Sequence, residues 1–170
     1  MTMTLIFASE LRSHLSQVKL LALDVDGVLT DGGLYYTESG EVLRKFNIKD
    51  GQGIKLLKQA GIEVAIITAK SASSTLQRAK DLGINHAYLG IEDKLSTLKI
   101  LCEKLGILLS QVAYVGDDIN DLEVLQSVGC PLTVADAMSA NQDIAIYVTK
   151  LAGGQGAVRE ICELLIAHIS

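Results

Sequence analysis

The stretch VKLLALDVDGVLT, residues 18–30, decides the fold. Its first part, Val18–Val25, is an almost continuous apolar run, which is typical of a strand that is covered on both faces of a parallel sheet. An acidic sequence that contains Asp24, Asp26 and Gly27 closes this run. Because ligands of open parallel sheets bind beyond the carboxyl ends of the strands, the same stretch predicts a functional site there.

Similar apolar runs recur along the chain and alternate with helical patterns. We predict further strands at Glu63–Thr68, His86–Leu89, Val112–Gly116 and Pro131–Ala135, and helices at Gln52–Gln59, Ser71–Leu82, Lys94–Leu105, Asp121–Ser127 and Gly156–Ile169. This alternation predicts a Rossmann-like, doubly wound α/β fold with a parallel sheet. Leu34–Ile48 breaks the rhythm and predicts a β-hairpin that turns at Ser39-Gly40, inserted after the first strand.

Length and composition predict one globular domain over residues 1–170. Hydrophobic residues make up 49% of the chain and charged residues 21%, close to the globular average. A net charge of −5 argues against a nucleic-acid-binding protein. No uncharged run approaches the roughly 20 residues that span a bilayer, and the opening MTMTLIFASE lacks the pattern of a secretory signal. The widely spaced Cys102, Cys130 and Cys162 favour free thiols, so we expect a cytoplasmic protein with no membrane partner.

Polar side chains gather where the predicted strands end. They comprise two groups of carboxylates, one hydroxyl and one lysine: Asp24, Asp26, Thr68, Lys94, Asp117, Asp118 and Asp121. Crowded carboxylates repel one another, and burying such charges unpaired is costly. A hard divalent cation removes this conflict, and Mg²⁺ prefers oxygen ligands completed by a substrate phosphate. The pattern therefore predicts a magnesium site that takes a phosphate-bearing substrate.

The spacing of Asp24 and Asp26 indicates phosphoryl transfer. Residues two apart in an extended chain face the same side, so both carboxylates can face one substrate. One carboxylate can attack phosphorus to form an aspartyl-phosphate. The other can protonate the leaving oxygen and later activate water. Lys94 and the Thr68 hydroxyl can hold the phosphoryl oxygens while their charge redistributes.

DVDGVLT, a strand-ending Thr, a Lys and GDDxxD, in this order, resemble the motifs of the haloacid-dehalogenase-like superfamily of aspartyl-phosphate phosphatases. The resemblance implies that Asp24 is the nucleophile and a magnesium ligand. It implies that Asp26 is the acid/base and binds the metal through its backbone carbonyl. The remaining implied roles are phosphoryl binding by Thr68 and Lys94, metal binding by Asp117, and orientation of the metal ligands by Asp118 and Asp121.

The short intervals between these motifs leave no room for the cap domain that usually selects substrates in this superfamily. Thr68 follows Asp24 by 44 positions, and Lys94 follows Thr68 by 26. A capless site is open to water unless another subunit covers it. The apolar residues of the hairpin could pack on neighbours in a closed ring, or on their own sheet; they are Leu34, Tyr35, Val42, Leu43 and Phe46.

Further segments resemble the 3-deoxy-D-manno-octulosonate 8-phosphate phosphatase family; they are FNIKDGQGIKLL, RAKDLGI, YVGDD, VADA and AGGQGAVREICELL. The resemblance implies a capless homotetramer that hydrolyses this eight-carbon sugar-acid phosphate for lipopolysaccharide synthesis, with a neighbour's hairpin over each active site. It implies substrate contacts at Asn47, Ile48, Lys49, Asp50, Gly51, Lys55, Lys70 and Arg78. The four cations among them suit a substrate that carries both a phosphate and a carboxylate.

Two positions depart from the pattern of this family. Ala69-Lys70 stands where the family typically has Gly-Arg, and a lysine keeps the charge but loses bidentate recognition. Gln155 stands where the family commonly has Arg or Lys, within a glycine-rich tail that can fold over the active site. Both positions concern specificity. A nine-carbon ulosonate 9-phosphate, a sialic-acid-like sugar, is therefore an alternative substrate.

Two other classes of protein are alternatives to a phosphatase. A signalling receiver domain also surrounds a phosphorylated Asp with acids, Mg²⁺, Thr and Lys, but it carries no Asp two residues beyond the acceptor. A catalytically idle relative kept for oligomerisation would lack a catalytic residue, whereas Asp24, Asp26, Lys94 and Asp117 are all present. The three histidines show no metal-ligand spacing.

Overall fold

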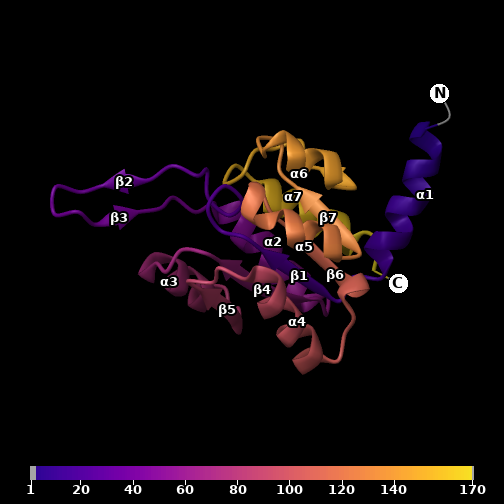
Figure 1. Ribbon diagram of the computed structural model, residues 1–170, viewed down its shortest axis with the longest axis horizontal. Helices are drawn as coiled ribbons and strands as arrows, with labels where there is room; N and C mark the ends of the chain where they lie inside the picture. Colours follow the sequence, from indigo (N-terminus) through magenta and orange to yellow (C-terminus); the bar gives the residue numbers. More distant parts are fainter. Residues whose placement is uncertain (1–2, 170) are drawn as a thin grey trace.

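The computed structural model describes residues 3–169, and it has helices on both faces of a six-stranded parallel sheet (Figure 1). Residues 1, 2 and 170 lie outside this description. All three belong to the predicted domain, and residues 1 and 2 also belong to the opening segment that lacks the pattern of a secretory signal. The strand order is β5-β4-β1-β6-β7-β8. The strands are β1 (Leu20–Leu23), β4 (Glu63–Thr68), β5 (His86–Leu89), β6 (Val112–Val115), β7 (Cys130–Thr133) and β8 (Tyr147–Val148). The chain winds to one side of β1 and then to the other, which confirms the predicted doubly wound sheet.

Alternate residues of the central strand face two separate cores. Leu21 and Leu23 of β1 pack with α2 and α7, whereas Leu20 and Ala22 pack with α4 and α5. The helices are α1 (Met3–Ser16), α2 (Ile48–Gln59), α3 (Ser73–Asp81), α4 (Lys94–Leu105), α5 (Leu122–Ser127), α6 (Ser139–Ile144) and α7 (Ala157–Ile166). This two-sided burial explains why the predicted strand is apolar at successive positions.

Several elements differ from the prediction. α1, α6 and β8 were not predicted, and β1 is shorter than the apolar run that contains it. α2 begins at Ile48, ahead of the predicted start at Gln52, because Asn47 caps it: the Asn47 side chain accepts a hydrogen bond from the N–H of Lys49 at 2.8 Å. Gly51 and Gly53 interrupt the helical pattern of the sequence, so the first turn of this helix was not predicted. A Cβ at Gly51 would lie 2.4 Å from Nη2 of Arg78, so the glycine allows a close approach to α3.

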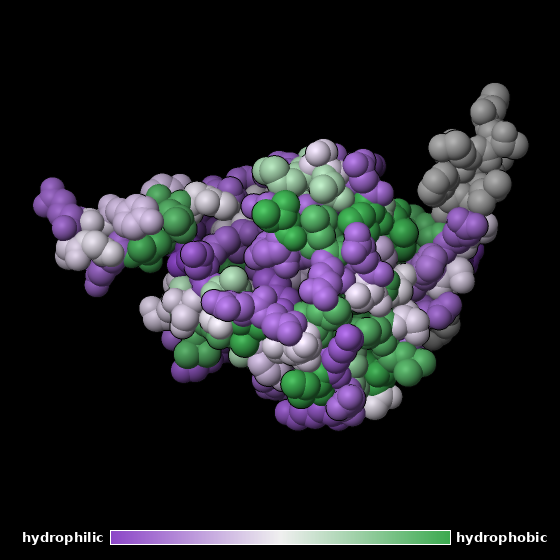
Figure 2. Space-filling model, in the orientation of Figure 1, coloured by the Kyte–Doolittle hydropathy of each residue, from purple (hydrophilic) through white to green (hydrophobic). Residues whose placement is uncertain are grey.

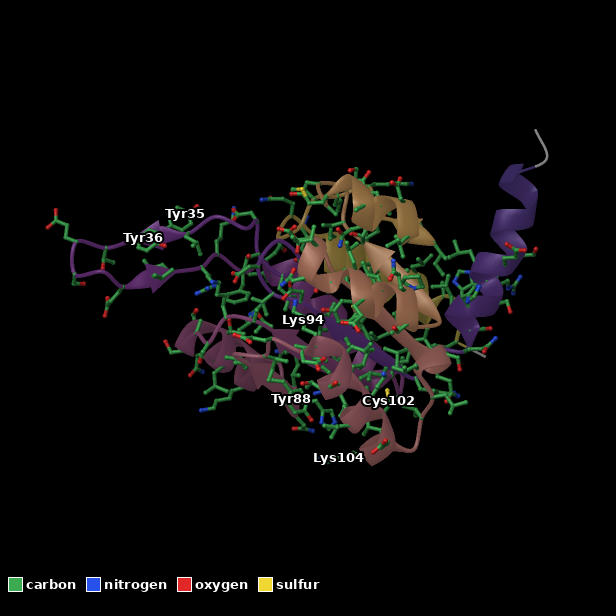
Figure 3. All side chains as sticks on the ribbon, viewed as in Figure 1. Tyr35, Tyr36, Tyr88, Lys94, Cys102 and Lys104 are labelled. Atoms are coloured by element: carbon green, nitrogen blue, oxygen red, sulfur yellow. The ribbon has the colours of Figure 1, made fainter. Side chains whose placement is uncertain are left out.

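The predicted hairpin is present and projects away from the sheet (Figure 1). β2 (Tyr35–Tyr36) pairs with β3 (Val42–Leu43), and the N–H of Gly40 closes the turn on the carbonyl of Thr37 at 2.9 Å. Figure 3 shows Tyr35 and Tyr36 on this arm; their exposed fractions are 54% and 69%. Apolar side chains of the arm are also visible on the surface in Figure 2. Phe46 packs at its base against the main core.

The described residues include no helix that has both the length and the apolar character needed to cross a membrane. The three cysteines are free and buried. Burial raises the pKa of the Cys130 thiol to about 12, so it is an unreactive core side chain at neutral pH.

Candidate active site

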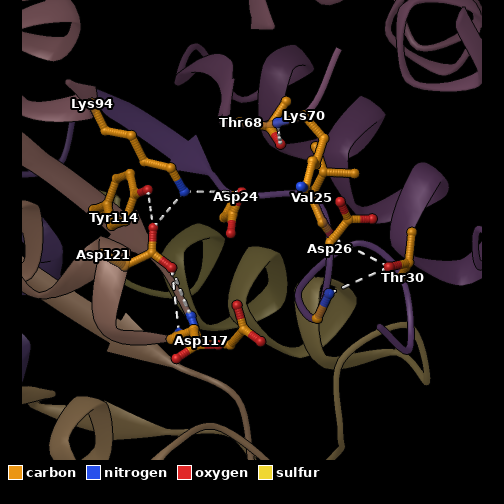
Figure 4. Close-up of polar contacts among 12 residues, drawn as sticks. Asp24, Val25, Asp26, Thr30, Thr68, Lys70, Lys94, Tyr114, Asp117 and Asp121 are labelled. Carbon is orange, nitrogen blue, oxygen red and sulfur yellow. Dashed lines mark hydrogen bonds and ion pairs between the residues drawn. The ribbon is translucent and has the colours of Figure 1, made fainter. Parts of the chain in front are cut away.

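The acidic loop after β1 begins in line with the sheet and then turns sharply. The N–H of Asp24 donates to the carbonyl of Val115 at 3.0 Å, which extends the pairing with β6 by one residue. Gly27 has φ +85°, a left-handed conformation that favours glycine. Thr30 then closes the loop, because its hydroxyl oxygen accepts the N–H groups of Gly27 at 3.3 Å and Gly32 at 3.2 Å. Figure 4 shows Asp24, Asp26 and Thr30 along this loop. Asp24 is buried, whereas the Asp26 side chain is 29% exposed.

Asp121 organises the second acidic loop, which follows β6. Its Oδ1 accepts the hydroxyl of Tyr114 at 2.6 Å and the ammonium of Lys94 at 2.7 Å. Its Oδ2 accepts the backbone N–H groups of Asp117 at 3.1 Å and Asp118 at 3.4 Å (Figure 4). Asp121 therefore has its hydrogen-bonding capacity largely filled and fixes the backbone that carries Asp117. This arrangement suits the predicted orienting role of Asp121.

Lys94 connects the two acidic loops. It begins α4, is almost fully buried, and its Nζ also lies 3.1 Å from Oδ1 of Asp24. Burial lowers the pKa of Lys94, but Asp24 and Asp121 outweigh that effect, so its pKa is raised above the usual value. The lysine therefore stays charged, and it fixes one oxygen of the predicted nucleophile.

The carboxylates around Lys94 are in excess over its one positive charge. Oxygen atoms of Asp24, Asp117 and Asp121 all lie within 4.8 Å of one another. Burial, followed by repulsion from Asp121, raises the pKa of Asp24 to about 6. Burial, followed by repulsion from Asp24 and Asp121, raises the pKa of Asp117 to about 7. A set of hard oxygen donors that repel one another fits Mg²⁺. Because Lys94, Tyr114 and two backbone amides already occupy Asp121, the carboxylates best able to bind a metal are Asp24 and Asp117.

A cavity of about 210 Å³ opens at this edge of the sheet. It is lined by Asp24, Asp26, Thr68, Ala69, Lys70, Asp117, Asp118 and Asn120. Thr68 ends β4 and is buried, and its hydroxyl accepts the N–H of Lys70 at 3.4 Å. The structure thus brings together the polar residues that the sequence predicts at the strand ends, with Lys94 and Asp121 in contact behind them. Ala69 and Asn120 lie inside the predicted motifs but were assigned no role.

Most of the predicted substrate contacts lie elsewhere in this single chain. Of the eight, Lys70 alone lines the cavity, as far as residues 3–169 show. The Asn47 amide donates to the carbonyl of Gly154 at 3.2 Å, and Arg78 donates to the carbonyl of Asn47 at 2.9 Å. Asp50 is buried and accepts the N–H of Arg159 at the start of α7 at 2.9 Å. These three side chains hold the segment after the hairpin in place.

The other predicted contacts are also outside the cavity. Gly51 is buried in α2, Ile48 and Lys49 are exposed at the start of that helix, and Lys55 lines a separate surface depression. The glycine-rich segment lies against the acidic loop, where the N–H of Gly154 donates to the carbonyl of Val28 at 3.0 Å. Gln155 is exposed and does not line the cavity. In this single chain the segment therefore lies beside the acidic loop, outside the lining of the cavity.

Two residues that contact the site were not predicted. Tyr114 lies within the buried strand VAYV. A tyrosine in such an apolar run indicates a buried hydroxyl group that needs a hydrogen-bond partner. Arg44 follows β3, and its Nε lies 2.7 Å from Oδ1 of Asp26. Nothing in the sequence indicates this ion pair, because it depends on the orientation of the hairpin relative to the loop after β1.

Comparisons with known proteins agree with this geometry. The family model described as haloacid dehalogenase-like hydrolase matches residues 45–129. The 3-deoxy-D-manno-octulosonate 8-phosphate phosphatase of Escherichia coli K12 is 49% identical over 149 residues, which cover 88% of this chain and 79% of that protein. The chain belongs to the haloacid dehalogenase-like hydrolases. This membership confirms the family resemblance of the motifs, and it excludes the alternative of a receiver domain.

Solved structures resemble this haloacid dehalogenase-like hydrolase over nearly its whole length. The 3-deoxy-D-manno-octulosonate 8-phosphate phosphatase of Moraxella catarrhalis, in complex with magnesium ion, phosphate ion and KDO, is 42% identical, with a TM-score of 0.92. The match covers 95% of this chain and 92% of that one. The cobalt-bound deoxy-D-mannose-octulosonate 8-phosphate phosphatase of Haemophilus influenzae is 36% identical, with a TM-score of 0.88 and 91% coverage of both chains. Both relatives bind a divalent cation, as the acidic cluster of this hydrolase predicts.

Proposed function

We propose that this protein hydrolyses 3-deoxy-D-manno-octulosonate 8-phosphate to the free sugar acid and phosphate, and so supplies a lipopolysaccharide precursor. The observation that carries this proposal is the meeting of Asp24, Asp26 and Asp117 around one cavity beside the buried Lys94. The relatives reported above, which are named for this reaction, support the same substrate.

In the first step, Asp24 attacks phosphorus and the bond from phosphorus to the sugar oxygen breaks. Lys94 holds Oδ1 of Asp24 at 3.1 Å, which fixes the orientation of the attacking carboxylate. Asp26 gives its proton to the departing sugar oxygen. In the second step, Asp26 takes a proton from water, water attacks the aspartyl-phosphate, and the bond between phosphorus and Asp24 breaks. This sequence returns both carboxylates to their starting states.

The other residues hold the phosphoryl group and the cofactor. Lys94 and the Thr68 hydroxyl bind phosphoryl oxygens. Mg²⁺, when bound by Asp24, Asp117 and the backbone carbonyl of Asp26, neutralises the carboxylates and the substrate phosphate. Asp121 keeps Asp117 in place through its backbone N–H, and Asp118 supports the same loop by accepting the N–H of Ile119 at 2.7 Å.

The whole chain, residues 1–170, acts in this proposal as one catalytic domain in the cytoplasm, and four copies form a homotetramer. The hairpin supports the assembly, because Leu34, Tyr35, Tyr36 and Leu43 are about half exposed or more in one chain. A neighbour's hairpin covers each cavity in place of a cap. In this proposal Lys49 and Lys55 of α2 and Arg78 of α3, which lie outside the cavity of their own chain, contribute substrate contacts in the assembly.

The substrate assignment is tested by release of phosphate from a panel of esters, with the Mg²⁺-loaded enzyme. We expect the highest kcat/KM with the eight-carbon 8-phosphate. A higher value with a nine-carbon ulosonate 9-phosphate would establish the alternative substrate. Lys70→Arg and Gln155→Arg, measured beside the wild type, show whether the two departures from the family pattern alter this preference. No hydrolysis of any ester by the wild type would favour the idle relative.

The assembly is tested separately by light scattering coupled to size-exclusion chromatography. We expect the mass of four chains for the wild type, and a smaller mass for Tyr36→Asp in the hairpin. A wild-type monomer that kept its full substrate preference would contradict the shared active site.

A further inference from the structure

Arg44 makes an ion pair with the predicted acid/base. Its Nε lies 2.7 Å from Oδ1 of Asp26, and its Nη2 lies 3.4 Å from Oδ2, so the two side chains meet as a fork. The Arg44 side chain is only 7% exposed, although it belongs to the base of a largely exposed hairpin. The hairpin is thus connected to the catalytic machinery through a buried, oriented contact.

Arg44 also lines a second cavity, of about 360 Å³, between the hairpin and the start of α3. We call it the hairpin cavity, and its lining consists of Leu34, Tyr36, Val42, Arg44, Lys70, Ser71, Ala72, Ser73 and Ser74. Lys70 lines the catalytic cavity as well, so the two cavities adjoin. For an ester whose phosphate binds in the catalytic cavity, the hairpin cavity is a neighbouring space that the rest of the molecule can occupy.

The hairpin cavity suits an anionic group. Its lining contains two cations, Arg44 and Lys70, and no carboxylate. The hydroxyl oxygen of Ser74 is buried and has no hydrogen-bond partner among the described residues. The Ala72 cap leaves the start of α3 without a side-chain acceptor, which adds partial positive charge. A carboxylate is the group that these features would bind.

The guanidinium of Arg44 has enough N–H donors to bind Asp26 and a second acceptor in the hairpin cavity. It carries five N–H groups, and the pair with Asp26 uses one on Nε and one on Nη2. Three N–H groups remain for a second acceptor. A lysine at this position could not hold two planar carboxylates in fixed directions.

We propose that Arg44 is a positioning residue that orients the ionised Asp26 carboxylate, the form that takes a proton from water, while it binds the substrate's carboxylate in the hairpin cavity. This inference rests on the proposed function, because it requires an ester that carries an acid group. Arg44 then links recognition of the distant end of the substrate to alignment of the acid/base. An ester without the acid group gains the alignment of Asp26 but not the additional binding.

The test compares Arg44→Met, Arg44→Lys and a matched control, Lys45→Met. Lys45 is the next residue and pairs with Asp31 at 2.9 Å, but it is 51% exposed and outside both cavities. Each full-length, Mg²⁺-loaded variant is assayed with 3-deoxy-D-manno-octulosonate 8-phosphate and with ribose 5-phosphate, which has no carboxylate. We expect Arg44→Met to lower kcat about tenfold on both esters, part of the usual contribution of acid–base catalysis. We expect its KM to rise about tenfold for the acidic ester only, as loss of a charge-assisted contact implies.

Rescue by the conservative variant separates positioning from a purely structural role. Arg44→Lys should restore KM for the acidic ester, because it keeps the charge, but not kcat, because it loses the fork. Wild-type kcat and KM in Arg44→Met, or an equal rise of KM with both esters, would overturn the inference. Should Arg44→Met lack a cooperative thermal transition, Arg44→Lys with wild-type kcat overturns it instead. A wild-type enzyme with no preference for the acidic ester contradicts the proposed function, whereas a preference that survives Arg44→Met contradicts only the role of Arg44.

Discussion

Lys94 donates to Oδ1 of Asp121 at 2.7 Å, and the two side chains are 2% and 0% exposed. The same carboxylate accepts the Tyr114 hydroxyl and two backbone amides of the loop that carries Asp117. A complete buried ion pair contributes little net stability, but removal of Asp121 would leave the Tyr114 hydroxyl and two amides without their acceptor and Lys94 paired with Asp24 alone. Asp121 is therefore important for the order of the site, although it does not line the catalytic cavity.

We expect Asp121→Asn to lower the free energy of unfolding by about 3 kcal/mol. The amide keeps the shape, but it leaves Asp24 as the remaining ion-pair partner of Lys94 and places an NH₂ donor against groups that now donate to Asp121. Tyr114→Phe removes a single hydrogen bond to the same oxygen and should cost about 1 kcal/mol. Urea unfolding of the three proteins in the absence of Mg²⁺ measures the difference. Equal losses in the two variants would show that charge pairing with Lys94 is unimportant.

Gly27 leaves room for Asp117. A Cβ at position 27 would lie 1.9 Å from Oδ2 of Asp117. We expect Gly27→Ala to displace that carboxylate and to weaken Mg²⁺ binding by about tenfold or more, the usual effect of disturbing the supports of a metal ligand. Gly32→Ala is the matched control, because Gly32 also has positive φ, at +75°, but its nearest neighbour would be 3.8 Å away. Both variants carry the backbone strain, so similar Mg²⁺ titrations for the two would refute the steric explanation.

Substitutions of the two aspartates proposed as catalytic, Asp24 and Asp26, should lower turnover to different extents. Asp24→Asn should abolish turnover and leave the fold intact, because it removes the nucleophile but keeps a side chain of the same size. Asp26→Asn should slow turnover by at least about 100-fold, the scale of general acid–base catalysis. Asp31→Asn, in the same loop but paired with the exposed Lys45, should keep near wild-type activity. Phosphate release and far-UV circular dichroism measure both properties, and appreciable turnover by Asp24→Asn would contradict the aspartyl-phosphate route.

The sequence predicts for a physical reason that the proposed catalytic residues gather at one edge of the sheet. Each of these residues lies directly at the end of a buried strand or the start of a helix, and parallel strands bring their carboxyl ends to one edge. Asp24 after β1, Thr68 at the end of β4 and Lys94 at the start of α4 all follow from such local patterns. The boundaries of α4 also agree with the prediction, because its apolar spacing is uninterrupted by glycine.

The substrate side of the site is not predictable in the same way. Asn47 and Asp50 have polar side chains at a helix start, and the sequence cannot show that they serve to cap α2 and α7 within the chain. The contact between Arg44 and Asp26 joins residues 18 positions apart through a hairpin whose tilt depends on tertiary packing. Such contacts have no period or motif that a sequence pattern could reveal.

The acidic cluster makes the metal-free protein sensitive to pH. Asp24 and Asp117 have pKa values of about 6 and about 7 in the folded chain, above the ordinary value of 3.8. A carboxyl with a raised pKa binds its proton more tightly when folded. Its contribution to stability is therefore complete below the unfolded pKa and is lost as the pH rises through the folded pKa. We expect the metal-free protein to become less stable between about pH 4 and about pH 8.

Magnesium should reverse this loss, because it binds the ionised carboxylates of the folded state. Thermal unfolding is measured at about pH 5 and about pH 8, with a chelator or with excess Mg²⁺. We expect Mg²⁺ to raise Tm by about 5 °C or more at the higher pH and by much less at the lower pH, where protons compete for Asp24 and Asp117. Asp24→Asn removes one repelling charge, so its metal-free Tm should fall less steeply as the pH rises. An equal effect of Mg²⁺ at both pH values would mean that the ion binds outside the cluster of Asp24, Asp117 and Asp121.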